Sequence, residues 1–145
     1  MKHIILIFTI ILSANMSSQT HLSYYFGDNT NFDESIPKPS EIIGHEVGEW
    51  HVTHDKLVQY MYAVAEASDR VLIEETGKTY ENRPLLILKV SSNKNIKVLE
   101  KIQKKHIEIS DGKKMNEYEN MPAVVYQGYG VHGNEASASN ASILG

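Results

Sequence analysis

The stretch V-L-I-E-E-T-G-K-T-Y-E-N-R-P-L-L-I-L-K-V, residues Val71 to Val90, decides the fold class of this 145-residue chain. Two largely apolar segments within it, Val71–Thr76 and Pro84–Val90, have strand character and are joined by a polar turn. Gly77 gives the turn backbone freedom, and Asn82 tolerates a positive φ better than most residues do. The sequence therefore predicts a β-hairpin near the centre of the chain.

The segments on both sides of the hairpin predict an α/β fold. The run Leu85 to Leu88 is continuously apolar, which favours a strand buried on both faces inside a helix-covered sheet. Apolar residues at helical spacing predict one helix over Asp55–Ser68 and a second over Asn95–Ile109. Ala123–Gln127 (A-V-V-Y-Q) has the pattern of another short strand, and a third helix is expected to begin near Ala136. This order of elements predicts layers of helix on sheet.

The first residues have the three-part pattern of a secretory signal peptide. Lys2 gives a positive start, Ile4–Leu12 is almost wholly apolar, and small and polar residues follow. The apolar run is too short to span a bilayer as a helix, which takes about 20 residues. We expect cleavage between Ala14 and Gln19 and an exported protein, periplasmic or secreted. An uncleaved N-terminal anchor is the alternative.

We expect a signal peptide over residues 1–18, an extended lead-in over 19–35 and one domain over 36–145.

The composition of the chain limits the classes of partner that it could bind. The net charge of −4 offers no basic surface for nucleic acid or for an anionic membrane. The chain has no cysteine, which excludes a disulfide scaffold and a thiolate metal site. An exported chain without cysteine suits a bacterial periplasmic or secreted protein, and the sequence indicates no particular oligomeric state.

The residues that carry chemistry are His132-Gly133-Asn134-Glu135, which follow the predicted strand at its C-terminal end. Ligand sites of α/β sheets lie at such strand ends. An imidazole and a carboxylate three residues apart can reach one Zn²⁺ ion, and both are ligands that zinc accepts. His132 is the one histidine of seven with a glutamate three positions later. The alternative is a loop histidine that is hydrogen-bonded to a helix-capping glutamate.

Two other polar clusters are weaker candidates. His45 to His51 does not have the H-E-x-x-H zinc pattern, because the fifth position is Glu49. His51 and His54 could form a surface metal pair, but capping and packing at the entry to the first helix explain them as well. The acidic and amide residues near Asp28 fail the spacing of a calcium loop, and we interpret them as turn formers.

Several of these motifs, in this order, resemble the M14 family of zinc carboxypeptidases. Gly130-Val131-His132-Gly133-Asn134-Glu135 looks like the first zinc-ligand segment of that family, and Glu74–Val90 resembles its early hairpin. His54–Met61 resembles its opening helix. The lead-in I-P-K-P-S-E-I-I-G-H-E-V-G-E-W-H is similar to that of exported bacterial members. The resemblance covers about residues 36–145.

The resemblance implies an open, twisted, mixed β-sheet flanked by helices. It implies one Zn²⁺ ion with His132 and Glu135 as its first two ligands, and a peptide substrate cut at its C-terminal bond. Such sites use two histidines, one glutamate and a water. Asn134 stands where digestive members carry a substrate-binding arginine, whereas regulatory members often have H-G-N-E as here, so a digestive-type subsite is not expected. Asn82 replaces the usual turn glycine.

In the family, the third zinc ligand and the general-base glutamate lie well downstream of the H-x-x-E motif, so we expect them beyond Gly145. No histidine follows His132 in this sequence. We therefore expect an N-terminal fragment of a zinc carboxypeptidase, without a catalytic residue of its own, inactive and unstable alone. An unfinished sheet would leave an open apolar edge.

Other functions are compatible with the same residues. One is a zinc amidohydrolase on the same fold, such as a deacylase or a peptidoglycan peptidase. Another is a non-catalytic secreted domain in which H-G-N-E is a relic. A further alternative is that the 145 residues are the complete protein.

Overall fold

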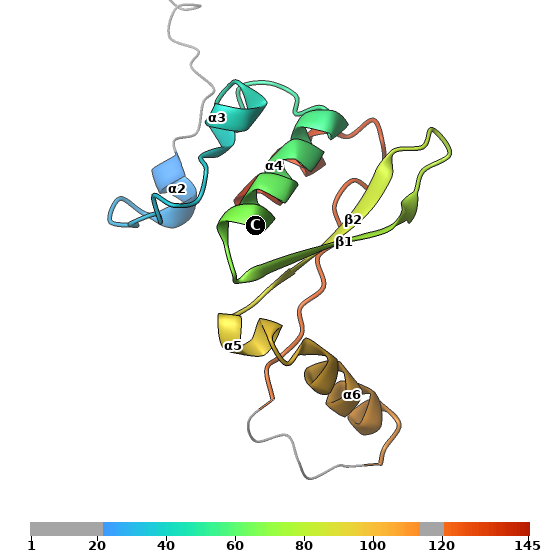
Figure 1. Cartoon of the computed structure of the whole chain (residues 1–145). Coiled ribbons are helices and arrows are strands. Elements are labelled where there is room, and N and C mark those ends of the chain that lie inside the picture. Colours follow the sequence, from blue (N-terminus) through green and yellow to red (C-terminus); the bar gives the residue numbers. More distant parts are fainter. Residues whose placement is uncertain (1–21, 114–120) are drawn as a thin grey trace, which may run out of the picture. The chain divides into compact units, whose positions relative to one another are not determined.

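The computed structural model describes residues 22–113 and 121–145 (Figure 1). The chain divides into two compact units, residues 1–32 and 33–145. The predicted signal peptide lies outside the described residues. The first unit contains the short helix α2 (Leu22–Phe26), where the sequence predicted an extended lead-in. No helix in the described ranges has the length and apolarity that crossing a membrane requires.

The predicted hairpin is confirmed as the sheet of the second unit. Strands β1 (Val71–Lys78) and β2 (Pro84–Val90) pair antiparallel, with Val71 opposite Val90 and Ile73 opposite Leu88. The two strands form a two-stranded sheet, and the other elements of this unit are helices. This arrangement is consistent with an α/β part of a carboxypeptidase-like fold. Parallel pairing between strands, which a mixed sheet requires, does not occur among the described residues, where the one parallel bridge joins Val47 to Trp50 outside the strands.

The turn lies later in the sequence than the strand pattern predicted. Gly77 belongs to β1, at a register shift between Glu75 and Gly77 that indicates a β-bulge. Asn82 adopts φ 64°, a left-handed conformation that asparagine tolerates. The backbone N–H of Asn82 donates to the Thr79 carbonyl at 2.9 Å, which closes the turn. The prediction for Asn82 is thus confirmed, whereas Gly77 works in the bulge and not in the turn.

The prediction that β2 is buried on both faces is wrong for this structure. Exposure alternates along the strand: Leu86 and Leu88 are partly buried, whereas Leu85 and Ile87 are 47% and 40% exposed. Helix α4 (His54–Ala67) packs against the sheet (Figure 1), and the described residues place no second layer over Leu85 and Ile87. A continuous apolar run therefore predicts that a strand forms, but it does not show whether one or both faces of the strand are buried.

The core lies where α4 meets α3 (Pro39–Ile43) and the loop between these helices. Ile43, Val52 and Tyr60 are its buried side chains, at 5%, 6% and 8% exposure. The helix α4 agrees with its predicted range within one residue, and the partly buried apolar residues of its inner face pack around this cluster: Leu57, Met61 and Val64. Helix α3 begins with Pro39 at its first position, where the missing N–H costs nothing.

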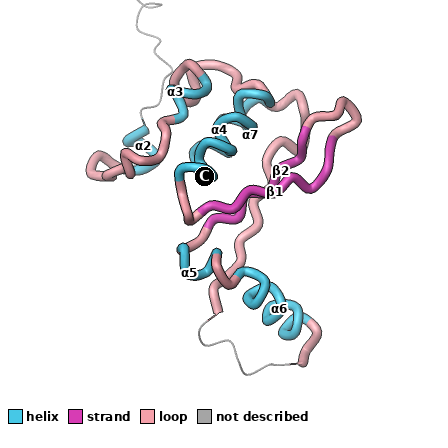
Figure 2. Tube along the Cα trace, in the orientation of Figure 1, coloured by secondary structure: helices cyan, strands magenta, loops and turns pink. Residues whose placement is uncertain are grey.

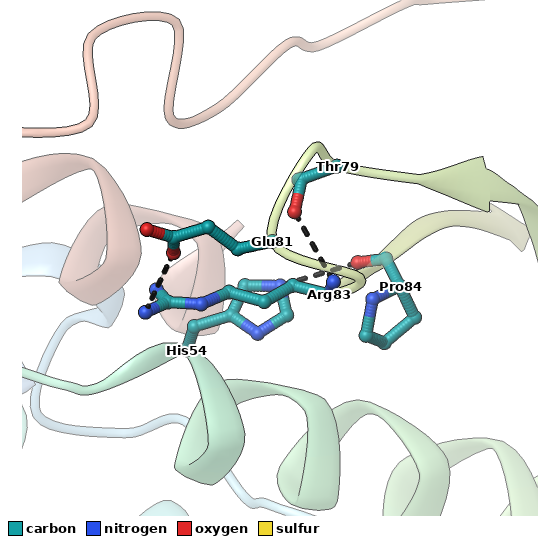
Figure 3. A network of polar contacts seen from close by, with 5 residues as sticks. All are labelled: His54, Thr79, Glu81, Arg83 and Pro84. Carbon is teal, nitrogen blue, oxygen red and sulfur yellow. Dashed lines mark hydrogen bonds and ion pairs between the residues drawn. The ribbon is translucent and has the colours of Figure 1, made fainter.

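A polar contact joins the hairpin to the start of α4, close to a hydrogen bond and an ion pair within the turn (Figure 3). The His54 Nε2 atom lies 3.2 Å from the Pro84 carbonyl oxygen and is partly buried. Within the turn, the Arg83 backbone N–H donates to the Thr79 hydroxyl at 3.1 Å, and the Arg83 guanidinium pairs with Glu81 at 3.1 Å. The His54 contact joins the helix to the sheet at the point where β2 begins.

The second predicted helix is divided in two. Helix α5 (Asn93–Ile96) is one turn long, and α6 (Leu99–Ser110) follows after Val98, whose φ of −124° and ψ of 24° are not helical. Ser92 begins α5, since its side chain accepts a hydrogen bond from the Asn95 N–H. A short capped turn rich in asparagine precedes the amphipathic segment, which explains why one continuous helix does not form.

The strand predicted at Ala123–Gln127 does not form. Figure 2 shows this segment as loop, and Val124, Val125 and Tyr126 are 70%, 78% and 86% exposed. A strand exists only when its backbone groups pair with a neighbour, and these residues pair with no strand in the described structure. The helix expected from Ala136 is confirmed as α7 (Ala136–Leu144), which packs against α4.

Removing the buried Ile43 side chain tests how much the structure depends on this small core. We expect Ile43→Ala to lower the free energy of unfolding by about 2 to 5 kcal/mol, because the substitution leaves a cavity beneath α4. The matched control is Ile107→Ala on α6, which is 54% exposed. Urea unfolding of the two variants compares them, and equal losses of stability would contradict the assignment of the core.

The N-terminus of α4 contains a titratable group whose protonation can be followed directly. The Thr53 hydroxyl hydrogen-bonds the Asp55 carboxylate and lowers the pKa of Asp55 below its ordinary value of 3.8. Asp55 therefore favours the folded state above pH 3.8, and this contribution is lost as the pH falls through the lower pKa of the folded chain. We expect Thr53→Val to raise the Asp55 pKa in an NMR titration, whereas Thr53→Ser should leave it unchanged.

Candidate metal site

His132 and Glu135 lie at the junction between the loop and α7. Glu135 is the N-cap residue of α7, with φ −98° and ψ 89°, and its side chain forms no capping hydrogen bond to the helix. Its backbone N–H donates to the His132 carbonyl at 3.1 Å, which closes a tight turn through Gly133 and Asn134. This turn places the two side chains next to each other, as their spacing in the sequence predicted.

The two side chains contact each other directly. The His132 Nδ1 atom lies 3.1 Å from the Glu135 Oε1 atom, and the side chains are 67% and 57% exposed. An ionised carboxylate accepts hydrogen bonds and donates none, so the proton of this bond belongs to Nδ1. The alternative that the sequence left open, a hydrogen-bonded loop histidine, thus describes the metal-free arrangement. Glu135 bonds the histidine, however, and not the helix end.

The same geometry fits two ligands of one zinc ion. Ligand bonds of 2.0–2.2 Å in a tetrahedral site place two ligand atoms about 3.4 Å apart. The observed separation of 3.1 Å between Nδ1 and Oε1 is close to that value. Both atoms are accessible, so a small movement of the side chains would admit an ion between them.

A third ligand is not found among the described residues. In the part of the chain that the structure describes, no group of three or more histidine or acidic side chains could hold a metal ion. A catalytic zinc site needs three protein ligands and one open position. Among residues 22–113 and 121–145, His132 and Glu135 alone therefore fall one ligand short of such a site.

The other histidines near the core have structural contacts. His45 Nδ1 lies 2.9 Å from the Glu46 carbonyl, and His54 contacts the Pro84 carbonyl. His51 packs beside Trp50, with 6.1 Å between ring centroids. These contacts of His51 and His54 agree with the interpretation of this segment as capping and packing.

Asn140 contributes a contact that the sequence pattern did not reveal. Its Oδ1 atom accepts from the Gly48 N–H at 2.9 Å, and its Nδ2 donates to the Trp50 carbonyl at 3.1 Å. One amide group thereby binds α7 to the loop before α4, about ninety residues earlier in the chain. The signal available in the sequence was an asparagine inside a helix of alanine and serine, where this residue type is otherwise unfavourable.

The helix α7 is also held by one apolar contact. Ile143 packs against the cluster of Ile43, Val52 and Tyr60. Apart from Asn140 and Leu144, the other residues of α7 are alanine and serine, which contribute little apolar area. Ser137, which lies close to the metal pair in the sequence, is exposed and has no activating base among the described contacts.

Comparison with known protein families gives one match. The zinc carboxypeptidase family, peptidase family M14, matches residues 57–144, which include most of α4, both strands and the His132–Glu135 pair. No curated protein and no solved structure matches the chain.

Proposed function

Because this chain belongs to the M14 family of zinc carboxypeptidases, we propose that its His132 and Glu135 are the first two zinc ligands of a metallocarboxypeptidase active site. The observation that supports the proposal is the 3.1 Å approach of Nδ1 to Oε1 at the start of α7, within the matched region. The reaction proposed for the complete site is the hydrolysis of the C-terminal peptide bond of a peptide substrate.

Zinc bound at such a site acts as a Lewis acid on the scissile carbonyl and lowers the pKa of its bound water. The chain's own contribution is to present the ligand atoms. His132 offers its Nδ1 lone pair only after the proton that it shares with Glu135 has left this atom. Glu135 keeps the imidazole ring turned toward the shared position before any metal arrives, which limits the reorganisation that binding requires.

The general base and the groups that bind the substrate carboxylate are proposed to lie outside the described residues. No described acid lies with the metal pair in a cluster of three. Asn134, between the two ligands, is exposed and neutral, and it would offer an amide and not a positive charge to the substrate. The proposed site therefore differs from a digestive-type subsite at this position.

Metal titration tests the proposal. We expect the chain to bind Zn²⁺, or Co²⁺ as a spectroscopic probe, and His132→Ala or Glu135→Ala to weaken binding roughly tenfold or more, since each removes one of two ligands. The matched control is His51→Ala, an exposed histidine without a glutamate three residues later. Calorimetry with Zn²⁺ and visible absorption with Co²⁺ provide the readouts.

Equal affinities in all four proteins would contradict the proposed zinc ligands and would favour a non-catalytic domain. The reaction is then tested on protein in which a third zinc ligand completes the site. The assay compares a peptide that has a free C-terminus with the same peptide amidated at its C-terminus. Carboxypeptidase action requires a free C-terminal carboxylate, so a C-terminally amidated peptide should resist cleavage. Cleavage of both peptides would instead support an amidohydrolase on the same fold.

We also propose that the protein is exported, on the basis of Lys2 and the apolar run Ile4–Leu12. Expression in a bacterial host should yield a mature chain that begins between Ala14 and Gln19, as measured by mass spectrometry of the intact protein. Replacing Leu6 and Ile10 by aspartate should abolish this cleavage, because the apolar segment would be interrupted. An unprocessed chain in the cytoplasm would refute export.

A further inference from the structure

We propose that Asn140 is the positioning residue that fixes the metal-binding start of α7 to the loop before α4. The inference rests on the proposed function in one respect only, namely that the His132–Glu135 pair binds zinc. The two hydrogen bonds of Asn140, to the Gly48 N–H and to the Trp50 carbonyl, are the observations that carry it.

The Asn140 amide forms a hydrogen bond through each of its two polar atoms. Oδ1 accepts at 2.9 Å and Nδ2 donates at 3.1 Å, so the side chain can neither rotate nor flip without losing a bond. A carboxylate in this place would set an oxygen against the Trp50 carbonyl, and a leucine would lose both bonds. The loop is shaped to meet the amide, since Gly48 adopts φ 87° there.

Few other contacts hold α7 to the earlier part of the described chain. Among the described residues, Asn140 makes all the hydrogen bonds between α7 and the chain before residue 121, and Ile143 supplies the apolar contact with the core. The loop that leads to the helix, residues 123–131, pairs with no strand. Of these contacts, only the hydrogen bonds of Asn140 are directional.

Asn140 is linked to the His132–Glu135 pair through the helix α7. Asn140 follows the N-cap residue Glu135 by five positions, which is about 7.5 Å along a helix. A hydrogen-bonded helix of this length moves as a unit, so fixing Asn140 also fixes Glu135. The spacing of His132 and Glu135 is set by their own turn, whereas the placement of the pair within the fold is set by Asn140.

Amide hydrogen exchange of the whole chain, followed by NMR, tests the inference without any metal. In Asn140→Leu we expect the Gly48 and Glu135 amides and those of α7 to exchange roughly fivefold faster or more, because both hydrogen bonds are lost. Asn140→Asp keeps an acceptor for Gly48 and should show a smaller effect. The control Ser137→Ala, at an exposed position of the same helix, should change none of these rates.

Unchanged protection of α6 and of the β1–β2 hairpin shows that the variants remain folded. Faster exchange at Gly48 with no change at Glu135 or α7 would overturn the inference, because Asn140 would then be a local surface contact. If Asn140→Leu were unfolded, the same comparison would be made with Asn140→Asp.

A second readout separates this inference from the proposed function. Adding Zn²⁺ to the native chain should slow exchange at Gly48, and Asn140→Leu should abolish this response, because coupling between two sites is reciprocal. Zinc that binds through His132 without any response at Gly48 would overturn the positioning role alone. A native chain that binds no zinc would overturn the proposed function, while the exchange rates of the metal-free variants would still establish whether Asn140 fixes α7.

Discussion

The structure of residues 33–145 depends on one small apolar contact, the cluster of Ile43, Val52 and Tyr60 beneath α4. The helix α3, the loop that follows it, α4 and α7 all reach this cluster, the last through Ile143. Only these three hydrophobic side chains are buried among the described residues. Each polar contact between elements therefore has more influence on their placement than it would have beside a large core.

The same constraint explains where local sequence preference failed. The segments Pro84–Val90 and Ala123–Gln127 both have strand composition, but only the first has an antiparallel neighbour joined by a short turn. The second would have to pair with a strand distant in the sequence, and none is available to it in the described structure. Composition records the tendency to form a strand, whereas pairing decides whether one exists.

The sequence predicted those features whose causes are local. Helical spacing in α4 and the turn residue Asn82 depend on neighbours within a few positions, and both were predicted correctly. The exposed face of β2 depends on which layers surround it, and the division between α5 and α6 on a cap at Ser92 that apolar spacing does not record. Prediction was thus reliable for helical spacing and turn chemistry, but not for strand pairing, for the covering of sheet faces or for the cap at Ser92.

The candidate site likewise combines a local feature that the sequence predicted with a long-range contact that it did not predict. His132 and Glu135 meet because three residues separate them at the start of a helix, so their approach could be inferred from the motif alone. The contact of Asn140 with Gly48 and Trp50 joins segments about ninety residues apart, and no spacing rule predicts it. A metal site needs both kinds of information, since the motif sets the distance between two ligand atoms and the long-range contact sets where they lie. In this chain the motif brings the two proposed ligands together, and the amide of Asn140 joins their helix to the loop before α4.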